Sequence, residues 1–313
     1  MICKHTHLLE VQDLSVSFCM YDSGLAQREL KVISDLSIAV EPGEILAIVG
    51  SSGSGKSLLA HAILGILPNN ATVGGSIKWK GSELNPKLQQ TLRGREIALV
   101  PQSVSYLDPL MRVSGQVLGA DRKNKQKKQQ AANIFKRLDL EPSVCKLYPF
   151  QLSGGMTRRV LVSTAVIGDA ELIIADEPTP GMQTKQALEA LKIFRELADE
   201  GRGVILITHD IDLALNFADK IAVFYAGTTV EQAFSEDFLA GTDRLRHPYS
   251  KALWRAMPQN EFALIEGVQP YAGSLPEGCV FSPRCANCDG QCKKQVPEMR
   301  ELRDGFVRCF HAT

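Results

Sequence analysis

Hydrophobic and polar positions along the chain predict an alternating series of strands and helices. Leu8–Phe18 alternates apolar and polar residues, with one slip of phase, which is typical of a strand. Leu36–Val40 predicts a second strand, which ends at a turn containing Pro42 and Gly43. Continuous apolar runs then predict five short buried strands, at Ile45–Val49, Ile97–Val100, Leu172–Ala175, Val204–Thr208 and Ile221–Phe224.

Helical spacing fills two further parts of the chain. Lys56–Leu67 predicts a helix that stops before Pro68, and the pattern between residues 102 and 165 is mostly helical. Strands that alternate with helices imply a mainly parallel sheet. We therefore predict an α/β domain over residues 1–235, with a helical subdomain inserted at about residues 103–165. From about Glu231 the pattern weakens and Pro and Gly become more frequent, which predicts a small Cys-rich C-terminal extension over residues 236–313.

Composition narrows the class of protein. Of the 313 residues, 44% are apolar and 22% are charged, which is sufficient for a real core and a soluble surface. Lys plus Arg and Asp plus Glu both number 35, and this balance argues against a chain whose main role is to grip a nucleic acid backbone. The basic run Arg122–Lys128 is interpreted as the solvated face of a helix.

The expected compartment follows from two patterns that the sequence lacks. No apolar run reaches the roughly 18 residues needed to cross a bilayer, and no apolar stretch follows Lys4 as in a signal peptide. We therefore expect a cytosolic chain, unless a partner tethers it. In that reducing compartment the eight cysteines are not expected to form a disulfide framework. Five of them crowd the C-terminus, at Cys279, Cys285, Cys288, Cys292 and Cys309.

The loop after the first buried strand carries the clearest chemical signal. Its residues Gly50, Ser51, Ser52, Gly53, Ser54, Gly55, Lys56 and Ser57 match the pattern G-x-x-x-x-G-K-[ST]. The glycines let backbone N–H groups turn inward and form an anion nest at the start of a helix. Lys56 is placed to reach the β- and γ-phosphates of a nucleotide, and the Ser57 hydroxyl is placed to bind Mg²⁺.

Polar residues at the ends of other buried strands complete a candidate site. Asp176 is suited to hold Mg²⁺, and Glu177 is placed to orient or deprotonate an attacking water. His209 follows another strand and is predicted to contact the γ-phosphate. The amide of Gln102, near the end of a third strand, is suited to sense Mg²⁺ or the lytic water. Ligands collect at this edge of open α/β sheets, so we expect these side chains to lie together.

A second glycine-containing helix start indicates the family. Gln151–Met156, with the sequence Gln-Leu-Ser-Gly-Gly-Met, places two glycines after a serine at the start of a helix, with no strand before it. The chain resembles an ABC-type ATPase, and this segment resembles the signature motif of that family. The motifs appear in family order from Leu8 to about Val230.

The resemblance implies a role for each of these residues. The implied parts are the aromatic that stacks on adenine (Phe18), the Walker A loop (Gly50–Ser57), the Q-loop (Gln102), the Walker B aspartate (Asp176), the catalytic carboxylate (Glu177) and the switch histidine (His209). The implied cofactors are ATP and Mg²⁺, with Mg²⁺ bound through Ser57, Gln102 and Asp176.

In this family two ATPases pack head to tail, and the signature of one closes on the ATP of the other. Ser153, Gly154 and Gly155 would therefore act in trans. Two departures from the family pattern matter: Met156 stands where Gln or Glu is usual, and Gln183 replaces the Asp expected in the D-loop region. The second departure favours asymmetric function beside a second, non-identical ATPase, and a neutral substitution is the alternative.

The C-terminal third narrows the resemblance to one subfamily. His247–Leu253 resembles the His-Pro-Tyr element of ATPases that energise oligopeptide, dipeptide and nickel uptake, and Gly278–Cys285 resembles the extension of the same subfamily. The implied function is ATP hydrolysis that powers import of peptides, or of nickel or a metal chelate. The implied partners are two transmembrane permeases and an extracytoplasmic substrate-binding protein, with no nucleic acid. The permeases would hold the chain at the cytoplasmic face of the plasma (inner) membrane.

Four cysteines, Cys279, Cys285, Cys292 and Cys309, are spaced so that their thiolates can converge on one metal centre, either tetrahedral Zn²⁺ or an iron–sulfur cluster. Members of the subfamily with these positions are associated with a [4Fe–4S] cluster, which the resemblance carries onto these four residues. Cys288 is a rival ligand that the family pattern lacks. Zn²⁺ and unmetallated buried thiols are the alternatives, and a structural or redox-sensing role is favoured over a catalytic one.

Other classes of ATPase fit the sequence less well. DNA-repair and chromosome-organising relatives interrupt the head with long coiled coils, and ribosome-acting relatives usually carry two cassettes. The present sequence has one phosphate loop and no coiled-coil pattern. A P-loop kinase would have no use for the signature. An ABC-type ATPase that is not coupled to transport stays the alternative to import, and the sequence does not separate peptide from nickel cargo.

Overall fold

The computed structural model describes residues 7–21 and 26–313. Residues 1–6, which include Cys3 and most of the stretch in which no signal peptide is predicted, lie outside the described residues. A 12-stranded sheet has the strand order β5-β4-β1-β2-β10-β9-β3-β8-β7-β6, and β12 and β11 branch from β10. Within the described ranges, no helix has the length and apolar character needed to cross a membrane.

Five parallel strands form the centre of the sheet and contribute residues to the cores on both of its faces. In spatial order they are β9 (Lys220–Tyr225), β3 (Ile45–Gly50), β8 (Gly203–Ile207), β7 (Leu172–Asp176) and β6 (Ile97–Val100). Alternate side chains enter opposite cores: Ala47 packs into one and Ile48 into the other. This two-sided burial explains the uninterrupted apolar runs, and the five predicted strands are confirmed.

Mostly antiparallel strands flank this parallel centre on one side. They are β1 (Leu9–Tyr21), β2 (Gln27–Val40), β4 (Ala71–Trp79), β5 (Ser82–Glu83), β10 (Thr228–Phe234), β11 (Arg300–Leu302) and β12 (Gly305–Val307). The predicted α/β class is confirmed, with the parallel strands at the centre of a mixed sheet. The first half of β2 is a partly exposed hairpin arm paired with β1, so it lacks the apolar run that marked Leu36–Val40.

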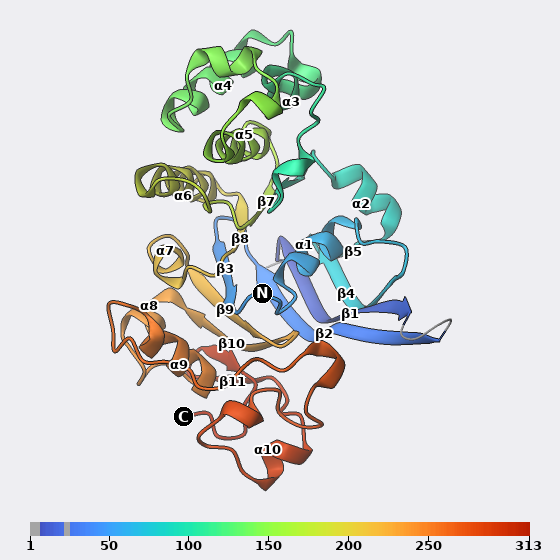
Figure 1. Cartoon of the computed structure of the whole chain (residues 1–313), viewed down its shortest axis with the longest axis vertical. Helices are drawn as coiled ribbons and strands as arrows, with labels where there is room; N and C mark the ends of the chain where they lie inside the picture. The colour runs from blue at the N-terminus through green and yellow to red at the C-terminus, as the bar shows by residue number, and fades with distance from the viewer. Residues whose placement is uncertain (1–6, 22–25) are drawn as a thin grey trace, which may run out of the picture.

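Helices cover the sheet and form one end of the molecule (Figure 1). They are α1 (Lys56–Leu64), α2 (Pro86–Leu92), α3 (Val113–Leu118), α4 (Lys125–Arg137), α5 (Gly154–Val166), α6 (Thr184–Asp199), α7 (Ile211–Leu215), α8 (Ser235–Leu239), α9 (Pro248–Ala256) and α10 (Gly290–Lys294). Helices α3 to α5 lie at the end opposite the C-terminal segment. The predicted end of α1 at Leu67 is wrong, because Gly65 turns left-handed (φ 62°) and its N–H caps the carbonyls of residues 61 and 62.

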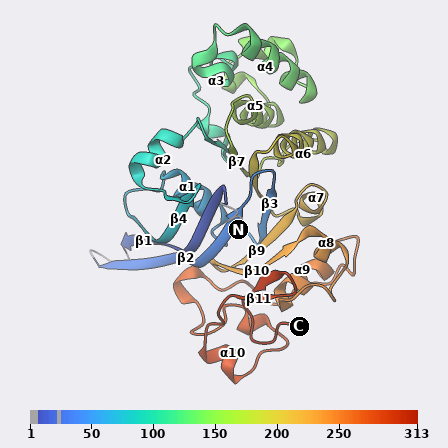
Figure 2. The ribbon, with the colours of Figure 1, turned by 180° about the vertical axis from the view of Figure 1, so that it is seen from behind.

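The segment after β10 is joined to the central sheet (Figures 1 and 2). Strand β12 pairs antiparallel with β10, with Glu231 opposite Val307. Phe281 and Cys292 from this segment belong to the same apolar core as α5 and α6. The C-terminal extension therefore shares both backbone hydrogen bonds and a core with the ATPase-like part of the chain.

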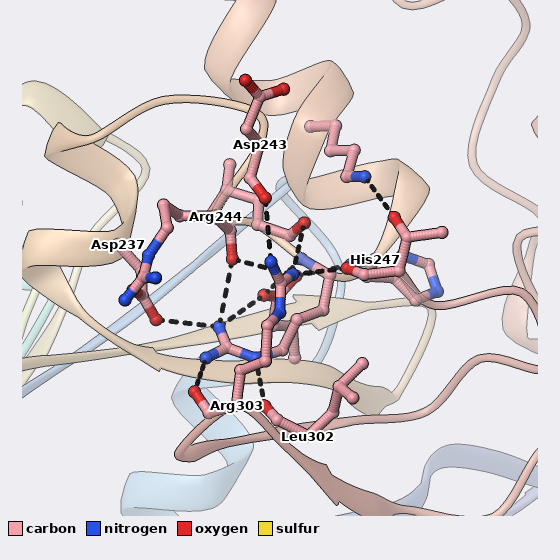
Figure 3. Close-up of polar contacts among 11 residues, drawn as sticks. Asp237, Asp243, Arg244, His247, Leu302 and Arg303 are labelled. Atoms are coloured by element: carbon pink, nitrogen blue, oxygen red, sulfur yellow. Dashed lines mark hydrogen bonds and ion pairs between the residues drawn. The ribbon is translucent and has the colours of Figure 1, made fainter.

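A buried ion network fastens the turn between β11 and β12 to β10 (Figure 3). Arg246 is 1% exposed and pairs with Asp237 at 2.9 Å and with Glu231 at 3.4 Å. Its Nε donates to the carbonyl oxygen of Leu302 at 2.5 Å, and a terminal nitrogen donates to the carbonyl of Arg303. Because buried charges are tolerated only when paired, this network fixes where the extension sits.

His247 lies beside the network and caps α9. Its backbone N–H donates to Glu231 Oε2 at 2.8 Å, and its Nδ1 accepts the Tyr249 N–H at 3.0 Å. Burial lowers the pKa of His247 from 6.5 to about 3. In the unfolded chain the imidazole takes up a proton below about pH 6.5, whereas the folded chain resists protonation until about pH 3. The contribution of His247 to stability is therefore complete above about pH 6.5 and is lost as the pH falls below it.

A His247→Asn variant is expected to lose less stability on acidification than the parent. Asn also caps helix N-termini and does not titrate, so the packing change is small and the proton linkage is removed. Linkage changes the free energy of unfolding by about 1.4 kcal/mol per pH unit, so the difference between parent and variant should shift by about 2 kcal/mol between pH 6.5 and 5. Denaturant unfolding at both pH values measures it, and a pH-independent difference would contradict the prediction.

Candidate active site

The loop Gly50–Ser57 connects β3 to α1, and its first residue can only be glycine. A Cβ on Gly50 would lie 2.1 Å from the carbonyl oxygen of Phe224 in the neighbouring strand β9. Gly55 precedes α1 with φ 96°, in the left-handed region that glycine adopts without strain. The sequence pattern therefore places a tightly packed glycine loop between a buried strand and a helix start, as predicted.

This loop borders a cavity of about 630 Å³. The predicted site residues around the cavity are Ser52, Gly53, Gly55, Lys56, Ser57, Gln102, Asp176, Glu177 and His209. Four separate segments of the chain thus meet at one place. Three further residues line the cavity: Val32, Leu58 and Pro180. No sequence pattern marks Val32 and Leu58 as site residues, because apolar residues next to a site look the same in sequence as residues of the core, whereas Pro180 lies in the predicted D-loop region.

Lys56 is buried among the carbonyl groups of its own loop. Its Nζ donates to the carbonyl oxygens of Gly50 and Ser51, both at 2.9 Å. Burial lowers the pKa of Lys56, and the carboxylates of Glu177 and Asp176 act in the opposite direction. A cation in this position is suited to bind an anion that enters the cavity.

Asp176 ends β7 inside the cavity and is 2% exposed. Its Oδ1 has no hydrogen-bond partner among the described residues. Burial raises the pKa of Asp176, and a hydrogen bond with Ser57 lowers it. A buried carboxylate oxygen left without a partner, beside a hydroxyl and the Gln102 amide, is an all-oxygen donor set that fits Mg²⁺.

Glu177 follows β7 in a strained backbone conformation. Its φ of 47° is in the left-handed region, which non-glycine residues rarely adopt and which recurs at functional sites. Its Oε1 lies 2.9 Å from His209 Nδ1, while its Oε2 is buried without a hydrogen-bond partner in the described part of the chain. One oxygen is therefore oriented by His209, and the other is left for a water in the cavity.

Arg158 supports the Gln102 segment from α5, and the sequence analysis missed it. Its Nη1 donates to the carbonyl oxygens of Pro101 at 3.0 Å and Gln102 at 2.5 Å. Burial lowers the pKa of its guanidinium, and the carboxylates of Asp176 and Glu177 act in the opposite direction. Its partners are backbone carbonyls of a distant segment, which no sequence pattern marks.

The predicted adenine contact and the three signature residues lie outside the cavity of this chain. Phe18 lies in β1 opposite Leu30 and Ala71 and packs against the core of that face. At the signature, the exposed Ser153 is the N-cap of α5, and its hydroxyl accepts the Met156 N–H at 3.4 Å. The serine thus stabilises the helix start while it stays open to solvent.

The two glycines of the signature, Gly154 and Gly155, open α5. A Cβ on Gly155 would lie 2.8 Å from the carbonyl oxygen of Gly181, so glycine lets the signature pack against the segment after β7. None of the residues at this helix start lines the cavity. Gln183 is exposed and precedes α6, and its N–H donates to the Gln186 side chain at 3.4 Å.

The remaining loop residues, Gly50, Ser51 and Ser54, also lie outside the cavity lining. Ser54 is buried, and its hydroxyl has no partner among the described residues. Gly50 and Ser51 line a second, smaller cavity, together with His209 and residues of the C-terminal extension. The glycine loop Gly50–Ser57 therefore borders the extension as well as the main cavity.

The C-terminal cysteines gather around α10. Cys279, Cys292 and Cys309 are buried and Cys285 is half-buried. Burial raises the pKa of each of these four thiols. The pKa of Cys309 is raised to about 11, and the other three thiols lie close enough to contribute to this increase. Cys288 lies close enough to Cys279 and Cys285 to affect their pKa values as well. Converging thiols of this kind are soft donors that suit zinc or an iron–sulfur centre.

Ligand spacing adds a second candidate set. Among the described residues, the group of three candidate ligand atoms within 4.8 Å of one another comprises the Asp289 carboxylate, the Cys292 thiol and the His311 imidazole. His311 Nε2 lies 3.1 Å from Asp289 Oδ2. The sequence analysis singled out Cys292 but neither Asp289 nor His311.

Comparison with known proteins decides the family. The family described as "ABC transporter" matches residues 33–180, and the family described as "Oligopeptide/dipeptide transporter, C-terminal region" matches residues 230–292. The oligopeptide transport ATP-binding protein OppD of Salmonella typhimurium is 34% identical over 321 residues, which cover 97% of this chain and 93% of that protein. The chain belongs to the ABC transporter family.

Further relatives support the same ABC family. The dipeptide transport ATP-binding protein DppD of Escherichia coli K12 is 33% identical over 316 residues, 95% of this chain and 94% of that protein. A dimeric ATP-binding cassette solved in a post-hydrolysis state with ADP and phosphate has a similar structure, with a TM-score of 0.64. The similarity covers 72% of this chain and 98% of that chain at 23% sequence identity, so it supports the fold alone. This ABC family member is an ATP-hydrolysing enzyme, and its predicted place in the branch with the oligopeptide/dipeptide C-terminal region is confirmed.

Proposed function

We propose that this ABC ATPase powers the import of peptides through a membrane transporter, with ATP bound in the 630 Å³ cavity. The observation that carries the proposal is the meeting of the glycine loop, Gln102, Asp176, Glu177 and His209 around one cavity. Relatives that match nearly the whole chain are named peptide, oligopeptide or dipeptide ATP-binding proteins, which favours peptides over nickel as the cargo.

Within the cavity, each residue has a proposed task. The glycine loop and Lys56 hold the phosphates, and Ser57, Asp176 and Gln102 are the residues that hold Mg²⁺. Mg²⁺ neutralises charge that develops on the phosphates. Glu177 Oε2 accepts a proton from the attacking water, while His209 holds Oε1 and faces the γ-phosphate.

The adenine contact is proposed for the strands beside the cavity. Phe18 of β1 is proposed to stack on the adenine ring, as the family resemblance implies. Val32 of β2 lines the cavity and offers a further apolar surface for the base. Substitution of Val32 by a charged residue is therefore expected to weaken nucleotide binding.

The partner ATPase is proposed to complete the site. Ser153, Gly154 and Gly155 stand exposed or half-buried at the start of a 13-residue helix, where backbone N–H groups and the helix dipole favour an anion. In our proposal they bind the ATP of a second ABC ATPase in trans. Gln183, in place of an Asp, favours a non-identical partner and unequal ATP sites.

The membrane partners are two permeases and an extracytoplasmic substrate-binding protein, which place the chain at the cytoplasmic face of the plasma membrane. The test is the complex co-purified with these partners and reconstituted in vesicles. Peptides delivered by the binding protein should stimulate ATP hydrolysis and enter the vesicle. Stimulation by nickel or a metal chelate, and not by peptides, would contradict peptide import, and hydrolysis that no cargo stimulates would favour an ATPase not coupled to transport.

For the cysteines, we propose that Cys279, Cys285, Cys292 and Cys309 hold a [4Fe–4S] cluster. The observation that supports one shared centre is that Cys279, Cys285 and Cys292 all lie close enough to Cys309 to affect its pKa. Zn²⁺ held by Asp289, Cys292 and His311 is the alternative.

A Cys309→Ser variant is expected to lose most of its iron and its visible absorbance when purified anaerobically, because a hydroxyl is a poor iron–sulfur ligand. Cys145→Ser is the matched control. Because Cys145 lies outside the C-terminal extension, this variant should keep the iron content of the parent. Metal analysis of both variants and the parent measures the result. A parent that carries zinc and no iron, with the zinc lost in His311→Gln, would contradict the cluster and support the alternative set.

A further inference from the structure

A second cavity, of about 240 Å³, separates the phosphate loop from the C-terminal extension. On one side lie Gly50, Ser51 and His209, and on the other lie Tyr249, Leu253, Ile265 and Arg284. The loop that is proposed to bind ATP is therefore bordered by a part of the chain that carries none of the ATP-site motifs.

Ser51, the second residue of the phosphate loop, is held across this boundary. Its hydroxyl donates to Oε1 of Gln269, and the same oxygen accepts the Ala226 N–H at 3.4 Å. The Tyr249 hydroxyl lies beside Ser51 at the same cavity; burial raises the pKa of this hydroxyl, and interaction with the side chain and backbone of Ser51 acts in the opposite direction. The remaining polar group of Ser51, its carbonyl oxygen, accepts from Lys56.

Tyr249 is held rigidly in place. It is 1% exposed, its ring lies 4.5 Å from that of Tyr225 and 5.3 Å from that of Phe281, and His247 caps the helix on which it sits. Phe281 belongs to the segment between Cys279 and Cys285. The Tyr249 hydroxyl is thus fixed by the core that also carries the cysteines.

Arg284 fixes the segment that leads to Gln269. The guanidinium of Arg284 donates to the carbonyl oxygens of Glu266 at 2.7 Å and Ile265 at 3.0 Å, three to four residues before Gln269, and to the Tyr225 hydroxyl at 3.3 Å. Arg284 directly precedes Cys285. The residues that contact Ser51, Tyr249 and Gln269, are therefore both anchored in the C-terminal extension, which also carries the cysteines.

We propose that Tyr249 and Gln269 are positioning residues that hold the phosphate loop in its ATP-binding shape. When ATP enters, Lys56 must leave the carbonyl of Ser51 to reach the phosphates, and the contacts from Tyr249 and Gln269 then keep Ser51 in place. A loop that is already ordered loses less conformational entropy when a nucleotide binds. These contacts therefore raise the affinity for ATP without touching the nucleotide. This inference rests on the proposed role of Gly50–Ser57 as the ATP loop.

The test measures nucleotide affinity and turnover separately in the full-length chain. Gln269→Ala and Tyr249→Phe are each expected to weaken binding of a fluorescent ATP analogue by about 3- to 10-fold, the loss of one hydrogen bond. Turnover at saturating ATP is expected to change by less than about 2-fold, since no reacting atom is touched. Tyr249→Phe keeps the ring and hence the core packing.

Matched controls and a double-mutant cycle make the test specific. Gln295→Ala and Tyr271→Phe make the same changes at exposed positions of the extension and should leave affinity unchanged. Ser51→Ala combined with Gln269→Ala should bind no more weakly than Ser51→Ala alone, because Ser51→Ala already removes the contact with Gln269. Parental affinity in both test variants, or fully additive losses in the double variant, would overturn the inference. If Lys56→Ala left nucleotide binding unchanged, the proposed ATP loop itself would be wrong, which separates the two failures.

Discussion

A Glu177→Gln variant should bind ATP and hydrolyse it at least about 100-fold more slowly than the parent. Gln keeps the shape of the side chain and its contact with His209, but its amide cannot accept a proton from water at the position of Oε2. In the proposed head-to-tail pair ATP holds the two ATPases together until it is hydrolysed, so the variant should accumulate in a closed, ATP-loaded pair. Phosphate release and size-exclusion chromatography of the assembled transporter with Mg-ATP measure both effects.

The matched control is Glu171→Gln, which neutralises an acid directly before the same strand β7. Glu171 pairs with Lys80 at the surface, away from the cavity, so hydrolysis should stay close to that of the parent. Parental turnover in Glu177→Gln would refute its assignment as the catalytic carboxylate. Loss of turnover together with loss of ATP binding would point to a structural role of Glu177 instead.

An Arg246→Met variant is expected to lose about 3–5 kcal/mol of its free energy of unfolding. The substitution keeps much of the apolar stem but leaves the buried Glu231 beside no cation, while Asp237 keeps only its pair with Arg244. An uncompensated buried charge is strongly destabilising. It also frees the carbonyls of Leu302 and Arg303 in the turn that Figure 3 shows held against β10. Denaturant unfolding of the purified chain measures the loss.

A second substitution tests whether charge is the cause. Glu231→Gln in the Arg246→Met background should recover part of the lost stability, because it removes the buried charge that Arg246 compensated, whereas Asp237 keeps its pair with Arg244. Arg255→Met is the control at the surface, where a half-exposed arginine pairs with Glu261 and should contribute less than about 1 kcal/mol. If Arg246→Met were as mild as Arg255→Met, the network would not hold the extension.

The parts of the fold that the sequence predicted are those with a one-dimensional signature. Strands buried on both faces leave uninterrupted apolar runs such as Ile45–Val49, and the polar residues that follow them mark the ligand edge of the sheet. This is why the sequence alone could predict that Asp176, Glu177 and His209 lie near one another. The glycine pattern of the loop is equally local, since the backbone conformation itself requires it.

The parts that the sequence did not predict depend on partners far apart in the chain. Ser51 and Gln269 are 218 positions apart, and neither residue type is unusual for a loop. Strand β12 has three residues, too few to show a period, and it forms because β10 offers it hydrogen-bond partners. Arg158 and Arg246 are buried charges whose partners are mostly backbone carbonyls, which no sequence pattern marks.

The pairing of β12 with β10 has a consequence for any attempt to shorten the protein. In a chain cut after Phe234, the backbone groups of Glu231 and Gln232 would lose their β12 partners, and β10 would have an open strand edge beyond Thr228, where it pairs with β2. Open edges recruit strands from other chains, so the truncated cassette should self-associate even if its ATP site were intact. Strand β12 is thus expected to keep the cassette from self-association, in addition to any role of the cysteines in the same extension.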